Sequence, residues 1–81
     1  MTEKLKKGYL QWRCRRGTKE LDVMLTQFLD NNYQQLSDAE LRIFDELLNT
    51  QDTKLWYLIS GQQQADSGSF KAIIDKINVK N

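Results

Sequence analysis

Leu36-Ser37-Asp38-Ala39-Glu40-Leu41 is the stretch that decides the fold, because it contains a complete start signal for a helix. Ser37 and Glu40 have the spacing of a capping box, in which each side chain accepts a hydrogen bond from the other residue's backbone amide. Leu36 and Leu41 stand at the two positions of a hydrophobic staple. The apolar stripe continues through Phe44, Leu47 and Leu48. The pattern predicts a helix over about 38–49.

The segment before this stretch has the pattern of a second amphipathic helix. Its apolar residues fall at i, i+3, i+4, i+7 and i+8, which places them on one face of a helix: Leu21, Met24, Leu25, Phe28 and Leu29. Thr18 stands where it can cap this helix, and Glu20 lies near its first turn, where the helix dipole favours negative charge. A polar connector over 31–35 is expected to separate the two helices.

Three shorter helices complete the predicted fold. Leu5, Tyr9, Leu10 and Trp12 have helical spacing, and we expect this first helix to end at a left-handed Gly17. Asp52 is expected to cap a helix that stops at Gly61, before an exposed loop over 62–68. The apolar residues of that helix and of the last one are Leu55, Trp56, Leu58 and Ile59, then Phe70, Ile73, Ile74 and Ile77. Because no period-2 alternation and no proline occur, the sequence predicts an all-α fold, a compact bundle of about five short helices.

The length and composition of the chain limit the functions that it can perform. The 81 residues make one domain, 1–81, whose ends, about 1–8 and 78–81, are expected to fray. The longest apolar run, 55–59, is far shorter than the roughly 20 residues that a membrane span needs, so no membrane insertion is expected. The charged residues 1–7 are followed by no apolar stretch of signal-peptide length, so the location is expected to be cytoplasmic. With no histidine and a single cysteine, Cys14, the chain can assemble neither a conventional zinc site nor a nucleophile paired with histidine. No catalytic, cofactor-binding or metal-ligating residue is predicted.

Charge is divided along the chain. Residues 1–19 hold seven cations and one carboxylate, and residues 20–60 hold eight carboxylates and two cations, giving +6 and −6. A basic segment of this kind raises the rate of encounter with an acidic partner or with nucleic acid, without deciding between them. One acidic set is expected to form the solvated side of a helix: Asp38, Glu40, Asp45 and Glu46.

The basic segment contains Arg15-Arg16-Gly17, which has two interpretations. In one, the cations complement the dipole of a helix that ends here, which stabilises it by about 0.3–1 kcal/mol. In the other, this segment docks a partner: Arg16 can form paired hydrogen bonds, Gly17 permits close backbone approach, and Glu20 holds the guanidinium in place. Catalysis by Glu20 is disfavoured because no second catalytic group accompanies it.

The two tryptophans and the cysteine have less specific interpretations. Trp12 and Trp56 are expected to pack in the core or at its rim. Cys14 is either a thiol activated by its arginine neighbours or an inert small hydrophobe, and it is left unassigned.

Arg16-Gly17-Thr18-Lys19-Glu20 resembles the Arg-Gly-x-x-Glu hallmark of the small assembly factors that promote covalent attachment of FAD to the flavoprotein subunit of succinate dehydrogenase. The resemblance covers roughly residues 9–61. It is carried further by Trp12, Arg15, Leu21, Asp22, Tyr33, Leu36-Ser37-Asp38, Glu40, Arg42-Ile43-Phe44, Leu47-Leu48, Asp52, Leu55 and Gly61. Two residues depart from the family pattern: Tyr9 replaces a basic residue, and Thr53 replaces a proline.

The resemblance implies a non-catalytic assembly factor that binds the flavoprotein subunit of succinate dehydrogenase or fumarate reductase. Its partner-binding residues would be Arg15, Arg16, Gly17, Glu20 and Asp22. FAD would be carried by the client flavoprotein and not held stably by this chain, which is expected to be monomeric when free and to bind no nucleic acid. Two alternatives stay open: a toxin–antitoxin or other protein-binding regulator, and a small nucleic-acid-binding protein that uses its basic amino-terminal segment.

Overall fold

The computed structural model describes residues 5–65 and 67–78. Within these ranges the chain forms five α-helices and one short 3-10 helix, with no β-strand. In order they are α1 (Lys7–Arg13), α2 (Lys19–Asn32), η1 (Tyr33–Gln35), α3 (Asp38–Leu47), α4 (Asp52–Ser60) and α5 (Gly68–Asn78). The predicted all-α bundle is confirmed. Residues 1–4 and 79–81, where fraying is expected, lie outside the described residues, and that expectation stays a prediction.

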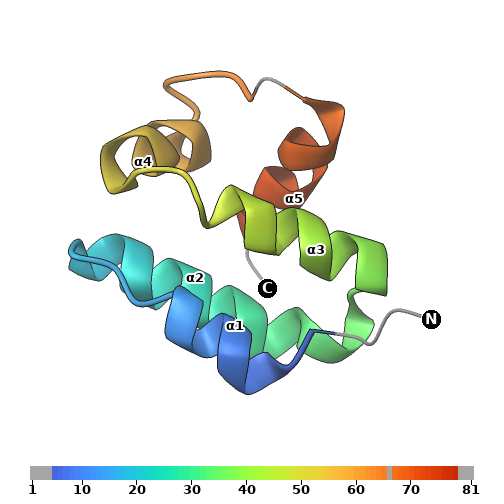
Figure 1. The fold of residues 1–81 in the computed structure, drawn as a ribbon. Helices are drawn as coiled ribbons and strands as arrows, with labels where there is room; N and C mark the ends of the chain where they lie inside the picture. Colours follow the sequence, from blue (N-terminus) through green and yellow to red (C-terminus); the bar gives the residue numbers. More distant parts are fainter. Residues whose placement is uncertain (1–4, 66, 79–81) are drawn as a thin grey trace.

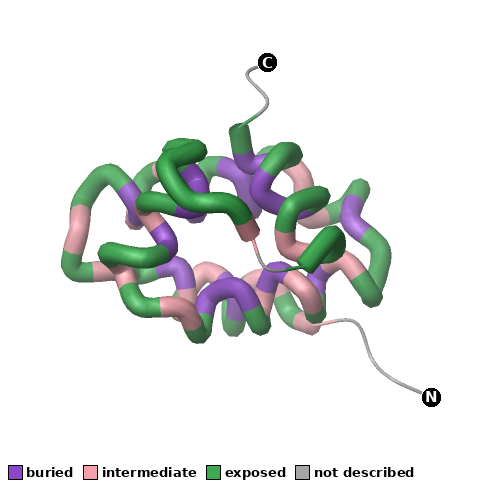
Figure 2. The backbone as a smooth tube through the Cα atoms, turned by 90° about the horizontal axis from the view of Figure 1, so that it is seen from above, coloured by how far each residue is buried: buried purple, intermediate pink, exposed green. Residues whose placement is uncertain are grey.

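The helices are arranged so that each buries one face against a neighbour. In Figure 1, α1 and α2 lie side by side, and α3, α4 and α5 form the other part of the bundle. Helix α5 packs against α3, α4 and α2, so it joins the two parts. The buried positions of all five helices gather in a single apolar core, and Figure 2 shows them interleaved with exposed positions along each helix.

The start of α3 forms as its sequence predicts. The Ser37 amide donates to Glu40 Oε1 over 2.9 Å, and the Glu40 amide donates to Ser37 Oγ over 3.1 Å. Both staple residues, Leu36 and Leu41, are buried. The helix ends at Leu47, two residues earlier than predicted, with Leu48 as its C-cap.

Helix α2 has the predicted apolar face, but it is longer than its pattern indicated. Thr18 is its N-cap residue, although the threonine side chain makes no capping hydrogen bond. The helix continues to Asn32, and η1 occupies most of the predicted polar connector. Tyr33 explains the added order, because its ring packs against the core and its hydroxyl donates to the Leu5 carbonyl over 2.5 Å.

Two predictions about helix ends are wrong. Helix α1 ends at Arg13 with Cys14, in a right-handed helical conformation, as its C-cap, so Gly17 is not a left-handed cap. Among the described residues only Gly61 has a positive φ, 86°, and it ends α4 as predicted. Asp52 does not cap α4: the N-cap is Gln51, and Asp52 is the first helical residue. Its carboxylate is free to bind the connection between α1 and α2.

The two tryptophans differ in their surroundings. Trp56 is half-buried and packs against the core, as expected. Trp12 is 69% exposed and is not among the residues that pack against the core, so the expected packing in the core or at its rim is wrong for it. The reason is the helical repeat: Leu10 and Cys14, four residues apart, are fully buried on one face of α1, and Trp12 lies midway between them on the opposite side.

Candidate functional site

The predicted docking residues lie at the corner where α1 passes into α2. Residues 14–18 connect the two helices, and the amide of Arg15 donates to the Trp12 carbonyl over 3.2 Å, which tightens the end of α1. Arg15 and Gly17 are exposed in this connection, and Glu20 is exposed in the first turn of α2. We call residues 15–20 the corner. It is therefore a surface feature, open to a partner.

Arg16 is the exception, because its side chain points into the molecule and is only 13% exposed. Its guanidinium donates to the carbonyl of Leu48 and, over 3.4 Å, to that of Thr50. It also contacts Asp52 Oδ1 at 3.3 Å. One arginine thus satisfies two carbonyls of the α3–α4 linker and pairs with the first residue of α4. Its role in this structure is to fix the corner to the other half of the bundle.

Gly17 is tied to the same carboxylate. Its amide donates to Asp52 Oδ2 over 3.1 Å, so the two oxygens of Asp52 hold two consecutive residues of the corner. A Cβ built on Gly17 would meet Asp52 Oδ2 at 3.5 Å, an ordinary contact distance. The fold therefore does not require glycine here. Gly17 differs from the other residues of the corner because its exposed backbone carries no side chain.

The sequence predicted that Glu20 holds the Arg16 guanidinium, and this prediction is wrong. The carboxylate that contacts Arg16 belongs to Asp52. Glu20 has no hydrogen-bond or ion-pair partner within the described part of the chain, and it lies at the positive end of α2. Asp22 is half-buried and accepts a hydrogen bond from the Thr26 hydroxyl over 3.3 Å. Of the two predicted carboxylates, Glu20 is therefore the more exposed and the one without such a hydrogen bond within the described residues.

Arg13 fastens the end of α1 to the end of α3. Its guanidinium donates to the Asp45 carbonyl over 2.9 Å and to Asn49 Oδ1 over 2.7 Å, and it pairs with Asp45 Oδ1 at 3.5 Å. Helix α3 has no basic residue in its own last turn. Arg13 and Arg16 therefore supply the positive charge that favours a helix C-terminus, from another helix and its connection.

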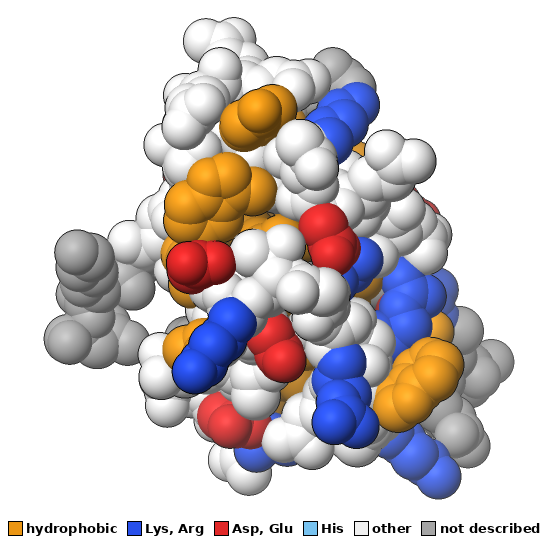
Figure 3. All heavy atoms as spheres, turned by 90° about the vertical axis from the view of Figure 1, so that its left-hand side faces the viewer, with side chains coloured by type: hydrophobic (Ala, Val, Ile, Leu, Met, Phe, Trp, Pro, Cys, Tyr) orange, Lys and Arg blue, Asp and Glu red, His pale blue; other side chains and the backbone are white. Residues whose placement is uncertain are grey.

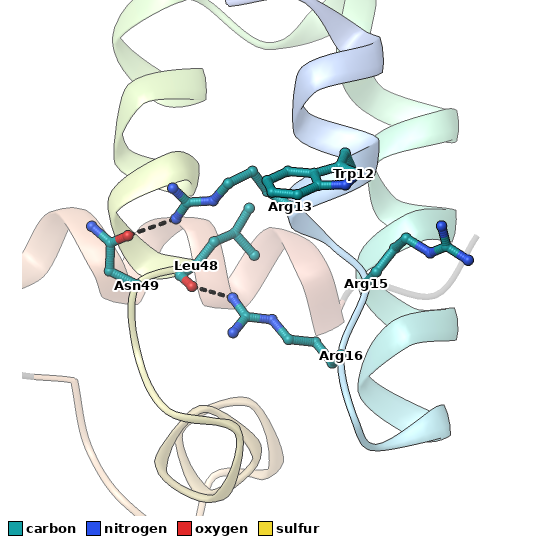
Figure 4. Close-up of a pocket in the computed structure, with 6 residues that line it drawn as sticks. All are labelled: Trp12, Arg13, Arg15, Arg16, Leu48 and Asn49. Atoms are coloured by element: carbon teal, nitrogen blue, oxygen red, sulfur yellow. Dashed lines mark hydrogen bonds between the residues drawn. The ribbon is translucent and has the colours of Figure 1, made fainter.

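An open hollow lies between the hydrogen bonds of Arg13 at the end of α3 and those of Arg16 to the α3–α4 linker. Its volume is about 490 Å³, and its lining residues are Trp12, Arg13, Arg15, Arg16, Leu48 and Asn49. Figure 4 shows Arg13 and Arg16 reaching toward the α3–α4 linker, whereas Arg15 extends away from both. No ion pair or side-chain hydrogen bond of Arg15 is found with any described residue. In Figure 3, which shows this side of the molecule, Lys and Arg side chains gather beside an exposed hydrophobic side chain.

Cys14, beneath the corner, is fully buried. Burial raises the pKa of its thiol to about 12, more than the nearby Arg16 lowers it. The possibility of an activated thiol is thereby removed, and Cys14 acts as a small core hydrophobe. The described residues contain no cluster of ligands able to hold a metal ion, and none of their helices has the length and apolarity to cross a membrane.

Several residues of this site were missed by sequence reasoning. Asp52, Leu48 and Thr50 hold Arg16 from positions more than thirty residues away. One signal was available: α3 ends without a basic residue of its own, which leaves its last carbonyls open to a cation from elsewhere in the chain.

Comparison with known proteins gives a consistent result. The family described as "Flavinator of succinate dehydrogenase" matches residues 9–81. A protein of Coxiella burnetii named FAD assembly factor SdhE is 38% identical over 77 residues, covering 95% of this chain and 94% of its own. Proteins of the same name from Xylella fastidiosa and Aliivibrio fischeri are 36% and 35% identical, covering 91% and 88% of this chain and 76% and 83% of theirs.

Proposed function

The chain belongs to the family of flavinators of succinate dehydrogenase, and from this membership we propose that it binds the flavoprotein subunit of that enzyme and promotes covalent attachment of FAD. The flavoprotein subunit of fumarate reductase is a second client of the same kind. FAD stays with the client in this proposal, and the chain acts without catalytic residues of its own.

The observation that carries the proposal is the corner between α1 and α2. Glu20 offers a carboxylate that has no partner among residues 5–65 and 67–78, and Gly17 offers exposed backbone with no side chain in front of it. These two groups are suited to contact a protein surface closely, since glycine lets another backbone approach. We propose that they make the central contacts with the client.

Arg16 has a different part in the proposal. Because its guanidinium is engaged by Leu48, Thr50 and Asp52, we propose that it acts as a positioning residue that sets the corner before the client arrives. A surface already held in its binding conformation loses less conformational entropy on association. Asp22 accepts a hydrogen bond from the Thr26 hydroxyl and is proposed as a second positioning residue, which supports the first turns of α2.

Binding energy is the source of the effect on FAD attachment. A client whose domains sample several arrangements shifts toward the one that the assembly factor binds best. If that arrangement aligns the flavin with its attachment residue, the reaction gains from orientation. The chain contains no histidine, which supports a mechanism in which the bond forms entirely within the client.

The test is to express the flavoprotein subunit with this chain or a variant and to measure flavin fluorescence in the denatured client. Gly17→Arg and Glu20→Ala should each reduce bound flavin strongly, and Arg16→Ala should reduce it through the loss of the fixed corner. Gly68→Arg and Glu46→Ala are matched controls, because both positions are exposed and lie outside the corner. Flavin attachment at the wild-type level with all three corner variants would refute the proposed function.

A further inference from the structure

We propose that the hollow beside Trp12 is a second contact point for the flavoprotein, and that it receives a client segment in which a carboxylate side chain lies next to an apolar one. This inference rests on the proposed function. It adds a residue that no pattern in the sequence had marked for binding, and it specifies the chemistry of what binds there.

Trp12 is the first ground for the proposal. Its side chain is 69% exposed, against 42–43% for the other exposed large hydrophobics of the described part of the chain, Tyr9, Val23 and Tyr57. A single exposed apolar residue is common on protein surfaces and needs no explanation by itself. Tryptophan and arginine, however, are the residues most enriched among those that dominate binding energy at protein interfaces. Trp12 lines a hollow with three arginines.

The second ground is that the walls of the hollow are held in place before any partner binds. Arg13 is fastened to Asp45 and Asn49, and Arg16 to the linker at Leu48 (Figure 4). Residues held by several hydrogen bonds lose little freedom when a partner packs against them. A client side chain that enters the hollow therefore meets a fixed surface.

The charges of the three arginines that line the hollow indicate which kind of client segment binds there. Arg13 is paired with Asp45 and Arg16 with Asp52, so the positive charge of these two guanidinium groups is already balanced. Arg15 has no such partner within the described residues, and it extends away from the other two arginines. One uncompensated guanidinium and one exposed indole that line the same hollow fit one carboxylate and one apolar side chain, because arginine binds carboxylates through paired hydrogen bonds.

A nucleic acid fits this surface less well. Binding to a phosphate backbone relies on several cations neutralising several phosphates. Here two of the three arginines at the hollow are already paired, and the carboxylates of Glu20 and Asp22 follow at the start of α2. The geometry favours a protein segment with isolated acidic residues.

The experiment measures association with the immobilised, full-length flavoprotein subunit of succinate dehydrogenase. Trp12→Ala should weaken binding about 30-fold, the effect of losing a strong interface residue, mainly through faster dissociation. Arg15→Glu should slow association about tenfold and reduce its dependence on salt. Tyr57→Ala and Arg42→Glu are matched controls: each makes a similar change at an exposed position outside the hollow, and each should bind as wild type does.

The outcomes separate this inference from the proposed function. If Gly17→Arg abolishes binding while Trp12→Ala and Arg15→Glu bind as wild type does, the hollow is not a contact point and the inference is overturned, although the proposed function stands. If the wild-type chain does not bind the flavoprotein at all, both fail. If Arg15→Glu abolishes binding to a single-stranded RNA at physiological salt and leaves the flavoprotein unaffected, the occupant is a nucleic acid and the inference is wrong.

Discussion

The guanidinium of Arg16 and the carboxylate of Asp52 lie 3.3 Å apart, and they join the α1–α2 connection to the first turn of α4. The two residues are 36 positions apart in the sequence. The same carboxylate accepts the Gly17 amide, so the exposed glycine of the corner is held by an acid from another helix. The surface proposed to meet the client is thus a product of the tertiary fold.

Removing both partners of this pair should reveal coupling between them. We expect Arg16→Ala to lower the free energy of unfolding by about 2 kcal/mol, because its hydrogen bonds are partly buried and charge-assisted. A double-mutant cycle with Asp52→Ala should give a coupling energy of about 1 kcal/mol in urea unfolding. The exposed pair Lys71 and Asp75 is the control, with an expected coupling of about 0.3–0.5 kcal/mol. Equal coupling in both cycles would contradict the structural role of Arg16.

Two glycines should respond differently to alanine. Gly61→Ala should lower the free energy of unfolding by about 1–2 kcal/mol, because its φ of 86° is unfavourable for any residue with a Cβ. Gly17→Ala should change it by less than about 0.5 kcal/mol, because the added Cβ makes only an ordinary contact. Thermal or urea unfolding of the two variants tests this contrast. A loss of stability in Gly17→Ala as large as that in Gly61→Ala would show that the corner needs glycine for folding.

The capping box should make stability depend on pH. Hydrogen bonding from the Ser37 amide, aided by Lys76, lowers the pKa of Glu40 from its ordinary value of 4.5. A carboxylate with a lowered pKa in the folded state stabilises the protein fully above its unfolded-state pKa, and this contribution is lost as the pH falls through the lowered value. The stability difference between wild type and Glu40→Gln should therefore be largest above pH 4.5 and shrink at lower pH. A difference independent of pH would contradict this account.

Cys14 should resist thiol reagents in the folded protein. Burial raises its pKa to about 12, so almost no thiolate exists at pH 8, and the sulfur is not accessible to solvent. We expect labelling by an aromatic disulfide reagent to be slow in native buffer and rapid in denaturant. Rapid stoichiometric labelling of the native protein would mean that α1 opens readily from the core.

The parts of the fold that follow from local signals were predictable. The start of α3 depends on Ser37 and Glu40, three residues apart, and the end of α4 depends on Gly61 alone. Helical spacing also identified the buried faces of α2 and α5. Such features need no knowledge of the tertiary structure, because the interacting groups lie within one or two helical turns.

The parts that depend on distant residues were not predictable. The sequence offered Glu20 as the partner of Arg16 because it is near in the chain, whereas the fold brings Asp52 to it. Gly17 was interpreted as a left-handed helix end because glycine often is, but α1 ends three residues earlier than this interpretation requires. The exposure of Trp12 depends on which face of a short helix meets the core, which Leu10 and Cys14 decide.

The corner over residues 15–20 is the face that the client covers in the proposed complex. Amide hydrogen exchange, measured with and without the flavoprotein subunit, tests it most directly. We expect slower exchange on binding at the amides of Thr18, Lys19 and Glu20, which precede the hydrogen-bonded part of α2, with little change in the loop over 62–65. Unchanged exchange at those three amides in a saturated complex, with protection elsewhere, would contradict it.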